Sequence, residues 1–467
     1  MRELLRMSAI TDQLARRFGV AGHRLYLVGG PVRDALLGRE TDDLDFTTDA
    51  RPEEVLALVS PLGPTWTTGI TFGTVGVQID DRKCEITTFR SDSYDPESRK
   101  PAVEFGLTVE GDLGRRDFTV NAMAVALPVD AAQPIVDPFG GLDDLVAKVL
   151  RTPDTPERSF GDDPLRMLRA ARFSAQLGFT VAPDAVAAIR SMAARLEIVS
   201  AERIRDELVK LLCSDHPRRG LELLVNTGLI EFCLPEVGRL TETVDEHRRH
   251  KDVYAHTLTV LEQAIALEPA GPDLVLRLAA LLHDIGKPKT RSIEADGKVS
   301  FHHHEVVGAD MTRKRLTELR FPGEIVDYVS RLVELHLRFH GYSGGTWTDA
   351  AVRRYVRDAG PLLDRLHSLT RSDCTTRNAR KARALAAAYD SLEDRIGELS
   401  AAEDLNKIRP DLNGNEIMRE LSLEPGPLVG KAYQYLLEQR LERGPLAHDE
   451  AVALLREWAR DQSLETS

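Results

Sequence analysis

Residues 29–45 decide the fold of the N-terminal part, and they read Gly-Gly-Pro-Val-Arg-Asp-Ala-Leu-Leu-Gly-Arg-Glu-Thr-Asp-Asp-Leu-Asp. The apolar run 25–28 predicts a strand, and the glycine pair after it predicts a tight turn that opens a short helix. Asp43 and Asp45 begin a second apolar strand, so their side chains project from the same face. Two adjacent carboxylates favour divalent metals held between them, and the glycine turn offers backbone N–H groups to a triphosphate. The stretch therefore predicts metal-assisted nucleotidyl transfer.

Length and composition restrict the class of protein. At 467 residues the chain is long enough for roughly two to four domains. No apolar run approaches a membrane-spanning length, and the N-terminus lacks the apolar core of a signal peptide, so we expect a cytoplasmic protein without a membrane partner. The net charge of −13 argues against indiscriminate nucleic-acid binding, although not against a local basic groove. The cysteines form no CxxC pair, which fits a reducing cytosol and argues against cysteine-bound zinc; they are Cys84, Cys213, Cys233 and Cys374.

The order of strand-like and helix-like segments predicts an α+β protein, with a mixed-sheet head followed by an all-helical body. Strand-like runs occur at 25–28, 44–48, 73–79 and 84–90. After Pro153 the pattern becomes helical, with helices predicted at 162–177, 183–193, 201–213 and 217–227. We expect a head over 1–152, a helical neck over 153–240, a metal-binding helical domain over 241–376 and a helical C-terminal region over 377–467.

Two further segments of the head carry candidate catalytic chemistry. Glu85 lies in a strand of apolar and β-branched residues, so it is a candidate third acid near the metals; the alternative is an edge-strand acid that faces water. Residues 115–122, Arg-Arg-Asp-Phe-Thr-Val-Asn-Ala, bring two guanidinium groups, an acid and an amide together. Guanidinium groups match phosphate oxygens, and the side chains of Asp117 and Asn121 can bond ribose hydroxyls.

Residues 162–172, Asp-Asp-Pro-Leu-Arg-Met-Leu-Arg-Ala-Ala-Arg, predict a helix on which Asp163, Arg166 and Arg169 share a face. One interpretation is a structural salt bridge between Asp163 and Arg166. The other is base recognition, because cytosine and adenine both present an amine donor beside a ring-nitrogen acceptor. An Asp acceptor next to an Arg donor matches that pattern, whereas guanine and uracil present the opposite polarity. Buried mismatched polar groups reject a substrate by about 10⁴-fold or more, so this segment predicts a protein-built template for C and A.

Taken in order, these motifs resemble those of the DNA polymerase β nucleotidyltransferase superfamily. Over about residues 20–235 they are most similar to its bacterial-type branch, the CCA-adding tRNA nucleotidyltransferases and poly(A) polymerases. Two more segments resemble motifs of that family, namely 137–141 (Asp-Pro-Phe-Gly-Gly), described as a hinge between head and neck, and 200–204 (Ser-Ala-Glu-Arg-Ile). The family usually has Glu where this chain has Asp162, a departure that leaves Asp163 and Arg166 in place.

The resemblance implies an activity, cofactors and partners. It implies addition of CCA to the 3′ end of tRNA from CTP and ATP, with contacts to the 3′ end and acceptor arm. Mg²⁺ would be held by Asp43 and Asp45, with Glu85 as the third catalytic acid. The implied nucleotide-binding residues are Gly29, Gly30, Arg33, Arg116, Asp117, Asn121, Asp163, Arg166, Arg169 and Arg172.

A second constellation of metal-ligand residues lies in the C-terminal half. His283 and Asp284 directly follow an apolar helix predicted at 274–282, and other His and Asp residues come from separate segments. Such a set can hold one or two divalent metals, and its spacing resembles the HD phosphohydrolase superfamily. In related nucleotidyltransferases this domain is either a phosphodiesterase or a structural and RNA-binding element, and both interpretations stay open. The predicted ligands are His256, His283, Asp284, His304, His336 and Asp373, with His302 and His303 as rivals for His304.

Three functions fit these observations. The first is CCA addition to tRNA, the second is poly(A) synthesis by the same chemistry on another primer, and the third is metal-dependent phosphohydrolysis through the histidine-rich domain. The intact Asp43 and Asp45 pair disfavours the third as the main activity. The first two share their motifs with each other and with enzymes that add only CC or only A. We therefore expect CCA addition, with the other activities as alternatives.

Overall fold

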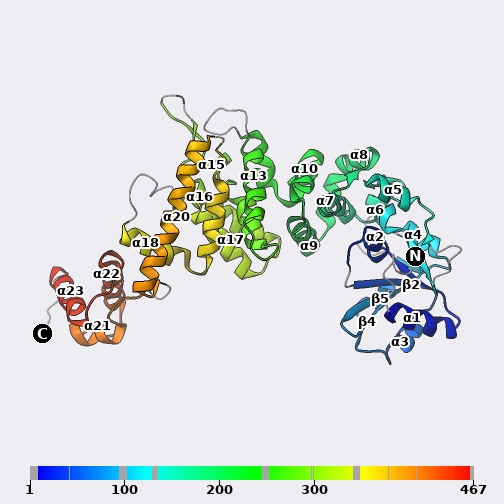
Figure 1. Ribbon diagram of the computed structural model, residues 1–467, viewed down its shortest axis with the longest axis horizontal. Helices are drawn as coiled ribbons and strands as arrows, with labels where there is room; N and C mark the ends of the chain where they lie inside the picture. Colours follow the sequence, from blue (N-terminus) through cyan, green and yellow to red (C-terminus); the bar gives the residue numbers. More distant parts are fainter. Residues whose placement is uncertain are drawn as a thin grey trace. The chain divides into compact units, whose positions relative to one another are not determined.

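The computed structural model describes residues 9–40, 43–93, 102–128, 135–243, 252–295, 297, 299–339, 348–376, 378–405 and 408–462. The chain folds as two units, residues 1–235 and 236–467. The first unit contains the main sheet, and the second is built almost wholly from helices (Figure 1). This division confirms the predicted α+β class, with a mixed-sheet head and a helical body.

The main sheet has seven strands in the order β3-β4-β5-β2-β1-β8-β9. Strand β2 pairs with β5 in parallel, and every other neighbouring pair in this sheet is antiparallel. A separate hairpin is formed by β6 (Arg90–Ser93) and β7 (Ala102–Phe105). The strands of the main sheet are β1 (Leu25–Val28), β2 (Asp43–Thr48), β3 (Thr65–Trp66), β4 (Thr74–Ile79), β5 (Arg82–Thr88), β8 (Ala124–Leu127) and β9 (Ile135–Val136).

Helices cover this sheet because each presents an apolar side to it. Leu14 and Phe18 of α1 (Ala9–Val20) are fully buried, as is Val55 of α3 (Pro52–Val59). They pack in one core with Phe46 and Ile86 from the two central strands. Around this core lie the short helices α2 (Gly30–Leu36), η1 (Ile70–Phe72), α4 (Val109–Gly114), η2 (Thr119–Asn121) and α5 (Gly141–Ala147). The core fixes β2 and β5, which carry the candidate catalytic acids.

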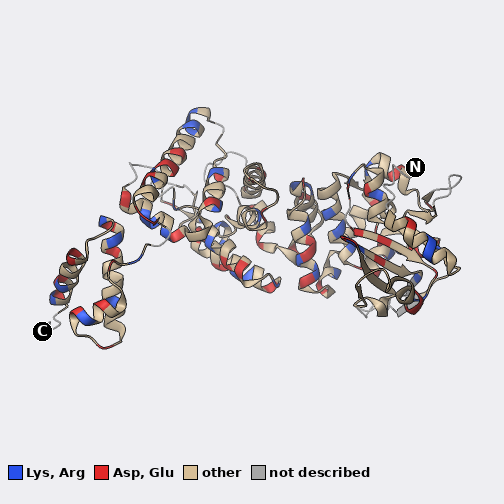
Figure 2. Ribbon diagram, turned by 60° about the horizontal axis from the view of Figure 1, so that its bottom comes forward, with Lys and Arg blue, Asp and Glu red and all other residues tan. Residues whose placement is uncertain are grey.

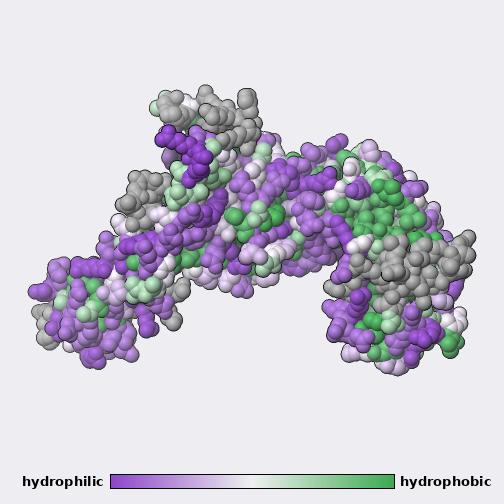
Figure 3. Space-filling model, viewed as in Figure 1, coloured by the Kyte–Doolittle hydropathy of each residue, from purple (hydrophilic) through white to green (hydrophobic). Residues whose placement is uncertain are grey.

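The rest of the first unit is helical, as the sequence predicts after Pro153. Its elements are β10 (Val149–Leu150), α6 (Pro156–Asp162), α7 (Leu165–Leu177), β11 (Thr180–Val181), α8 (Pro183–Met192), η3 (Ala193–Ile198), α9 (Ala201–Leu212), α10 (Pro217–Thr227) and α11 (Ile230–Cys233). In the view of Figure 3 an apolar patch lies over α5 and its neighbours. Two apolar residues of α5, Leu142 and Val146, are exposed.

The prediction of one continuous helix over 162–177 is wrong. Helix α6 ends at Asp162, and Asp163 has extended backbone angles, φ −140° and ψ 101°. Pro164 explains the break, because proline disfavours the helical conformation of the residue before it. Helix α7 then begins at Leu165, so Asp163 caps the junction instead of sharing a helical face with Arg166 and Arg169.

Helix α12 (Pro235–Gly238) begins one residue before the second unit, and η4 (Arg239–Glu242) and the helices around the histidine residues follow it. Oppositely charged residues alternate along its helices (Figure 2), as in the pair of Arg331 and Glu334 one turn apart. No helix in the described ranges combines the length and apolar character needed to cross a bilayer. The further elements are α13 (Val253–Ala266), α14 (Leu274–Leu282), α15 (Lys287–Thr290), β12 (Ser292–Ile293), β13 (Val299–Ser300), α16 (His304–Glu318), α17 (Gly323–Leu335), α18 (Asp349–Ala359), η6 (Gly360–Leu362), α19 (Leu363–Asp373) and α20 (Ala379–Ala402).

The chain ends in three helices with a core of their own, α21 (Gly414–Leu421), α22 (Pro427–Arg443) and α23 (His448–Asp461). A buried ion-pair network joins α22 to α18, because Glu403 accepts hydrogen bonds from Arg353 at 2.7 Å and Arg440 at 2.6 Å. Since breaking a buried pair leaves an uncompensated charge, this network holds the last three helices against the preceding ones.

Candidate active site and metal centre

The three predicted catalytic acids lie on one face of the main sheet. Asp43 and Asp45 alternate along β2 with Leu44, which is buried on the opposite face. The parallel register pairs Asp45 with Glu85 of β5. Because register partners on adjacent strands point to the same side, the three carboxylates form one acidic cluster.

The electrostatics of this cluster favour a bound cation. Burial, together with the negative charges of Glu85 and Asp43, raises the pKa of Asp45 to about 6, against the opposing effect of Arg116. A carboxyl group whose ionised form is disfavoured in this way gains most from a divalent cation placed among the acids. The donor set of carboxylate oxygens is the one that Mg²⁺ prefers.

The glycine turn brings Arg116 close to these acids. Gly29 has φ +72°, and a Cβ placed on it would lie only 2.7 Å from Nη1 of Arg116. A side chain at this position would thus displace the guanidinium group as well as strain the backbone. Among the described residues, the buried Nε of Arg116 has no hydrogen-bond partner. Gly30 follows as the first residue of α2.

The other predicted nucleotide-binding residues of the head form a buried hydrogen-bond network. Arg33 donates to Asn121 Oδ1 at 2.6 Å and pairs with Asp34 at 2.8 Å. Asn121 in turn donates to Asp117 Oδ1 at 2.9 Å, and Asp117 Oδ2 accepts from Arg169 Nε at 2.7 Å. Arg33 and Asp117 are therefore held by other side chains, and their polar atoms are oriented before any ligand binds.

Helix α7 adds a row of arginines at a spacing of three. Arg172 pairs with the buried Glu207 of α9 at 2.6 Å, and Arg169 lies 3.6 Å from the same carboxylate. Both guanidinium groups also lie over the ring of Phe173. Burial would raise the pKa of Asp117, but the charge of Arg169 holds it well below its usual range. These residues join α7 and α9 to the head around a permanently ionised carboxylate.

The side chains of Asp163 and Arg166 bind different partners, although the backbone N–H of Arg166 donates to the carbonyl of Asp163 at 3.0 Å. Asp163 accepts hydrogen bonds from Arg203 at 2.8 Å and from the backbone N–H of Leu165 at 3.1 Å. Arg166 is buried and donates to Ser159 Oγ at 2.9 Å and to the carbonyl of Arg115. The two candidate base-reading groups are thus held from different sides, which the interpretation as a simple surface salt bridge does not predict.

The second unit brings all six predicted histidine-domain ligands together, in two groups. Candidate ligand atoms within each group lie within 4.8 Å of one another. Of the three neighbouring histidines, His304 is buried in the cluster, whereas the side chains of His302 and His303 are 75% and 84% exposed. The two groups are His256, His283 and Asp373, and Asp284, His304 and His336.

The tautomers of three histidines suit metal binding. Nδ1 of His283, His304 and His336 each contacts a backbone carbonyl, at 2.9, 2.8 and 2.6 Å. A ring nitrogen that donates to a carbonyl leaves the other nitrogen as a lone-pair donor. The Nε2 atoms of all three are buried and lack a well-directed hydrogen bond in the described part of the chain. Imidazole nitrogens that are buried beside carboxylates fit divalent metal ions.

The charges around this cluster support the same conclusion. Burial alone would lower the pKa of His283, but Asp284 and Asp373 raise it to about 10. Burial lowers the pKa of His336 to about 3, so that ring stays neutral. The two carboxylates therefore stabilise one positive charge within the histidine cluster, the extra proton on His283. A metal ion bound there would replace that proton.

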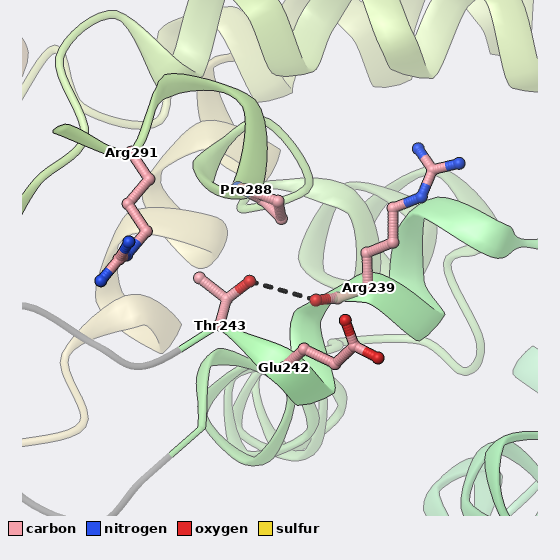
Figure 4. Close-up of a pocket in the computed structure, with 5 residues that line it drawn as sticks. All are labelled: Arg239, Glu242, Thr243, Pro288 and Arg291. Carbon is pink, nitrogen blue, oxygen red and sulfur yellow. Dashed lines mark hydrogen bonds between the residues drawn. The ribbon is translucent and has the colours of Figure 1, made fainter.

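A pocket of about 410 Å³ lies beside α15, the helix that follows the His283-Asp284 pair. Arg239 and Arg291 lie on opposite sides of it, and Thr243 donates to the carbonyl of Arg239 at 3.1 Å (Figure 4). Pro288 also lines the pocket, and the residue before it, Lys287, contacts Asp284 at 2.8 Å. Pro288 thus places one wall of the pocket four residues along the chain from Asp284, and Glu242 adds a carboxylate to the lining.

Sequence reasoning did not single out four residues that hold the candidate sites, Asp112, Ser159, Glu207 and Lys287. Asp112 could have been found, because it lies three and four residues before Arg115 and Arg116 in a helical segment. Glu207 has no such local signal, since it reaches Arg172 from another helix 35 residues along the chain.

Three family models match consecutive parts of the chain. Residues 25–151 match the poly(A) polymerase head domain, and residues 178–240 match the probable RNA- and SrmB-binding site of polymerase A. Residues 253–389 match the HD domain. The first match contains the acidic cluster, and the third contains the histidine cluster.

Curated relatives match the chain over different lengths. It is 35% identical to the A-adding tRNA nucleotidyltransferase of Deinococcus radiodurans over 445 residues, 93% of this chain and 95% of that protein. It is 42% identical to the CCA-adding enzyme of Levilactobacillus brevis over 214 residues, 46% of this chain and 52% of that protein. The match to this CCA-adding relative thus covers about half of either chain.

A solved structure matches nearly the whole fold. The crystal structure of the Bacillus stearothermophilus CCA-adding enzyme in complex with CTP aligns with a TM-score of 0.70 at 27% identity. The alignment covers 98% of this chain and 99% of that one. The chain therefore belongs to the bacterial-type family of tRNA nucleotidyltransferases and poly(A) polymerases, in the form that carries an HD domain.

Proposed function

We propose that this enzyme adds CCA to the 3′ end of tRNA, with CTP and ATP as substrates. The observation that carries the proposal is the cluster of Asp43, Asp45 and Glu85 on one sheet face, with Arg116 and the Gly29 turn beside it. Bound Mg²⁺ would supply Lewis-acid stabilisation of the transferring phosphoryl group. Divalent-metal dependence is general in nucleotidyltransferases, and Mg²⁺ is our proposal for this site.

Each group of residues has a proposed role in that reaction. Asp43 and Asp45 would hold the metal ions, and Glu85 would orient them as the third acid. Arg116 would bind the triphosphate, because its guanidinium group has an unpartnered Nε and lies against the glycine turn. The network around Asp117 and Asn121 would hold the nucleotide sugar. Asp163 and Arg166 would read the base edge, and Arg169 and Arg172 of α7 would support them.

Recognition of tRNA is proposed for the helices after the head. Residues 178–240 match an RNA-binding family model, and the resemblance implies contacts with the 3′ end and acceptor arm. We also propose the domain division 1–152, 153–240, 241–376 and 377–467, and a cytoplasmic location. The location is supported by the four free cysteines, which suit a reducing compartment.

Addition of A alone is the second candidate function. The relative that aligns along 93% of this chain is an A-adding enzyme, whereas the CCA-adding enzyme of Levilactobacillus brevis aligns over about half of it. An A-adding enzyme would use the same acids and the same arginines but would require a primer that already ends in CC. Poly(A) synthesis remains the third candidate, with another primer.

One assay separates these functions. Purified enzyme is incubated with a tRNA that lacks CCA and with one that ends in CC, each with CTP alone, ATP alone and both. We expect CTP and ATP together to give three added nucleotides on the first tRNA, and ATP alone to give one on the second. Extension of the CC-ending tRNA only would instead establish A addition, and a long A tail would establish poly(A) synthesis.

We propose a second activity, metal-dependent hydrolysis of phosphoesters, at the histidine cluster. The buried Nε2 atoms beside Asp284 support metal binding there. The guanidinium groups of Arg239 and Arg291 in the pocket at α15, which Glu242 also lines, would receive the negative charge of a phosphoester substrate. One or two divalent ions fit the two ligand groups.

Replacing both His283 and Asp284 with alanine tests the independence of this site. We expect the double variant to lose bound metal, measured by mass spectrometry after dialysis, and to lose any hydrolysis of 2′,3′-cyclic phosphate. Nucleotide addition should remain, because the acidic cluster of the head has its own ligands. The exposed His302→Ala is the matched control. Equal loss of nucleotide addition in the double variant, with unchanged thermal stability, would show that the two sites work as one.

A further inference from the structure

Asp112 of α4 is a fully buried carboxylate, and it has no role in the reaction proposed above. Its side chain is 0% exposed, and α4 is anchored by Val109 and Leu113, which pack in an apolar cluster beneath it. Burial would raise the pKa of Asp112, but the charges of Arg115 and Arg116 lower it below its usual value. A fixed negative charge is therefore present under the nucleotide site.

This carboxylate holds two consecutive arginines with its two oxygens. Oδ1 accepts hydrogen bonds from Arg115, at 3.0 Å from Nε and 2.7 Å from a terminal nitrogen. Oδ2 lies 3.4 Å from a terminal nitrogen of Arg116. Since Arg116 also lies against Gly29 and acts on Asp45, the contact with Asp112 fixes a guanidinium group beside the acidic cluster.

Asp112 is also connected, through Arg115, to the candidate base-reading residue Arg166. The carbonyl of Arg115 accepts a hydrogen bond from the buried guanidinium group of Arg166. Arg115 therefore contacts Asp112 through its side chain and Arg166 through its backbone carbonyl. One carboxylate thus reaches Arg116 on one side and, through Arg115, Arg166 on the other.

We propose that Asp112 is a positioning residue that aligns the triphosphate-binding Arg116 with the base-reading Arg166, so that nucleotide binding and base choice depend on one buried charge. The proposal rests on the roles given above to Arg116 and Arg166. Asp112 itself contacts neither substrate nor metal. Its role is to keep the two guanidinium groups at the separation that a bound nucleoside triphosphate requires.

The test is kcat/KM for all four nucleoside triphosphates on tRNA that lacks CCA, in wild type, Asp112→Asn and Asp112→Glu. Asparagine keeps the shape but removes the charge that pairs with both arginines. We expect KM for CTP and ATP to rise about 10- to 100-fold, the range for losing a hydrogen bond to a charged group. Selectivity against UTP and GTP should fall as well. Asp112→Glu restores the charge and should recover most of the KM effect.

Two comparisons separate this role from a purely structural one. Asp49→Asn removes another carboxylate that pairs with an arginine in the head, at 2.7 Å from Arg24, and should change neither KM nor selectivity. In the background of Arg116→Ala, Asp112→Asn should add little further increase in KM, because its partner is already gone. Reduced stability of Asp112→Asn with KM and base ratios unchanged in the folded fraction would overturn the proposal.

A different set of results would show that the roles proposed for Arg116 and Arg166 are wrong. If Arg116→Ala leaves KM unchanged and Arg166→Ala leaves selectivity unchanged, the roles assigned to those arginines are wrong, and with them the proposal for Asp112. If both arginine variants behave as expected while Asp112→Asn matches wild type, only the positioning role is wrong.

Discussion

Replacing Asp45 with asparagine is expected to lower the rate of nucleotide addition by about a thousandfold or more, because metal-assisted charge stabilisation supplies several kcal/mol and each 1.36 kcal/mol is a factor of ten. Asp43→Asn should have an effect of the same order. The rate is measured in single turnover at saturating tRNA and nucleotide. Retention of more than about a tenth of the wild-type rate in either variant would contradict the assignment of these acids as metal ligands.

The same substitution should stabilise the metal-free protein. The pKa of Asp45 is about 6 in the folded chain, above its ordinary 3.8, so the folded state binds the proton more tightly. The stability gained in this way is present at low pH and lost as the pH rises through that window. At pH 7 the ionised carboxylate is a cost that asparagine removes, so we expect a Tm higher by a few degrees without Mg²⁺. Glu53→Gln, which neutralises an exposed carboxylate of α3 outside the acidic cluster, is the control and should change neither rate nor Tm.

Replacing Asp163 or Arg166 with alanine is expected to lower the selectivity for CTP and ATP over UTP and GTP by about 10- to 100-fold, since an unpaired buried partner costs roughly 1–3 kcal/mol. Asp163 supplies the acceptor for the exocyclic amine, and Arg166 supplies the donor to the ring nitrogen. Triphosphate binding should suffer less, because Arg116 remains. The measurement is kcat/KM for the four nucleotides on tRNA that lacks CCA.

The control for base choice is Arg205→Ala, which removes an arginine of α9 that pairs with the neighbouring Asp206. It should leave the four ratios unchanged. A uniform fall in activity for Asp163→Ala and Arg166→Ala, with constant ratios, would mean that the two residues serve the structure alone. In that case the bonds of Asp163 to Arg203 and of Arg166 to Ser159 would be their whole function.

Periodicity predicted the parts of the fold that local rules govern. The run 25–28 is strand β1 with those bounds, and the alternation of Asp43, Leu44 and Asp45 placed both acids on one face. Helices expected at 183–193 and 201–213 are present within a residue or two at each end. These features depend on neighbours along the chain, so the sequence contains their whole cause.

Features that depend on residues far apart in the sequence could not be predicted from periodicity. Strand β8 was not predicted, although the apolar run 122–127 was a signal for it, because its pairing with β1 depends on a segment about a hundred residues earlier. The prediction of a helix through Asp163 failed for a local reason, since the effect of Pro164 on the preceding residue was not considered. The network that joins Arg33, Asn121, Asp117 and Arg169 spans three segments and has no sequence signal of its own.

The parallel pairing of β2 with β5 has a consequence for the insertions and deletions that this protein can tolerate in evolution. Strands β4 and β5 are joined by only Asp80 and Asp81, and Ile79 pairs with Arg82. A shift of one residue along a strand turns every side chain to the opposite face. A single deleted codon within β5 ahead of Glu85 would thus turn that acid into the apolar core and bring Ile86 to the side of Asp45. The chain would keep all its carboxylates and lose the catalytic trio, so the length of β5 ahead of Glu85 matters to the site as much as the acids themselves do.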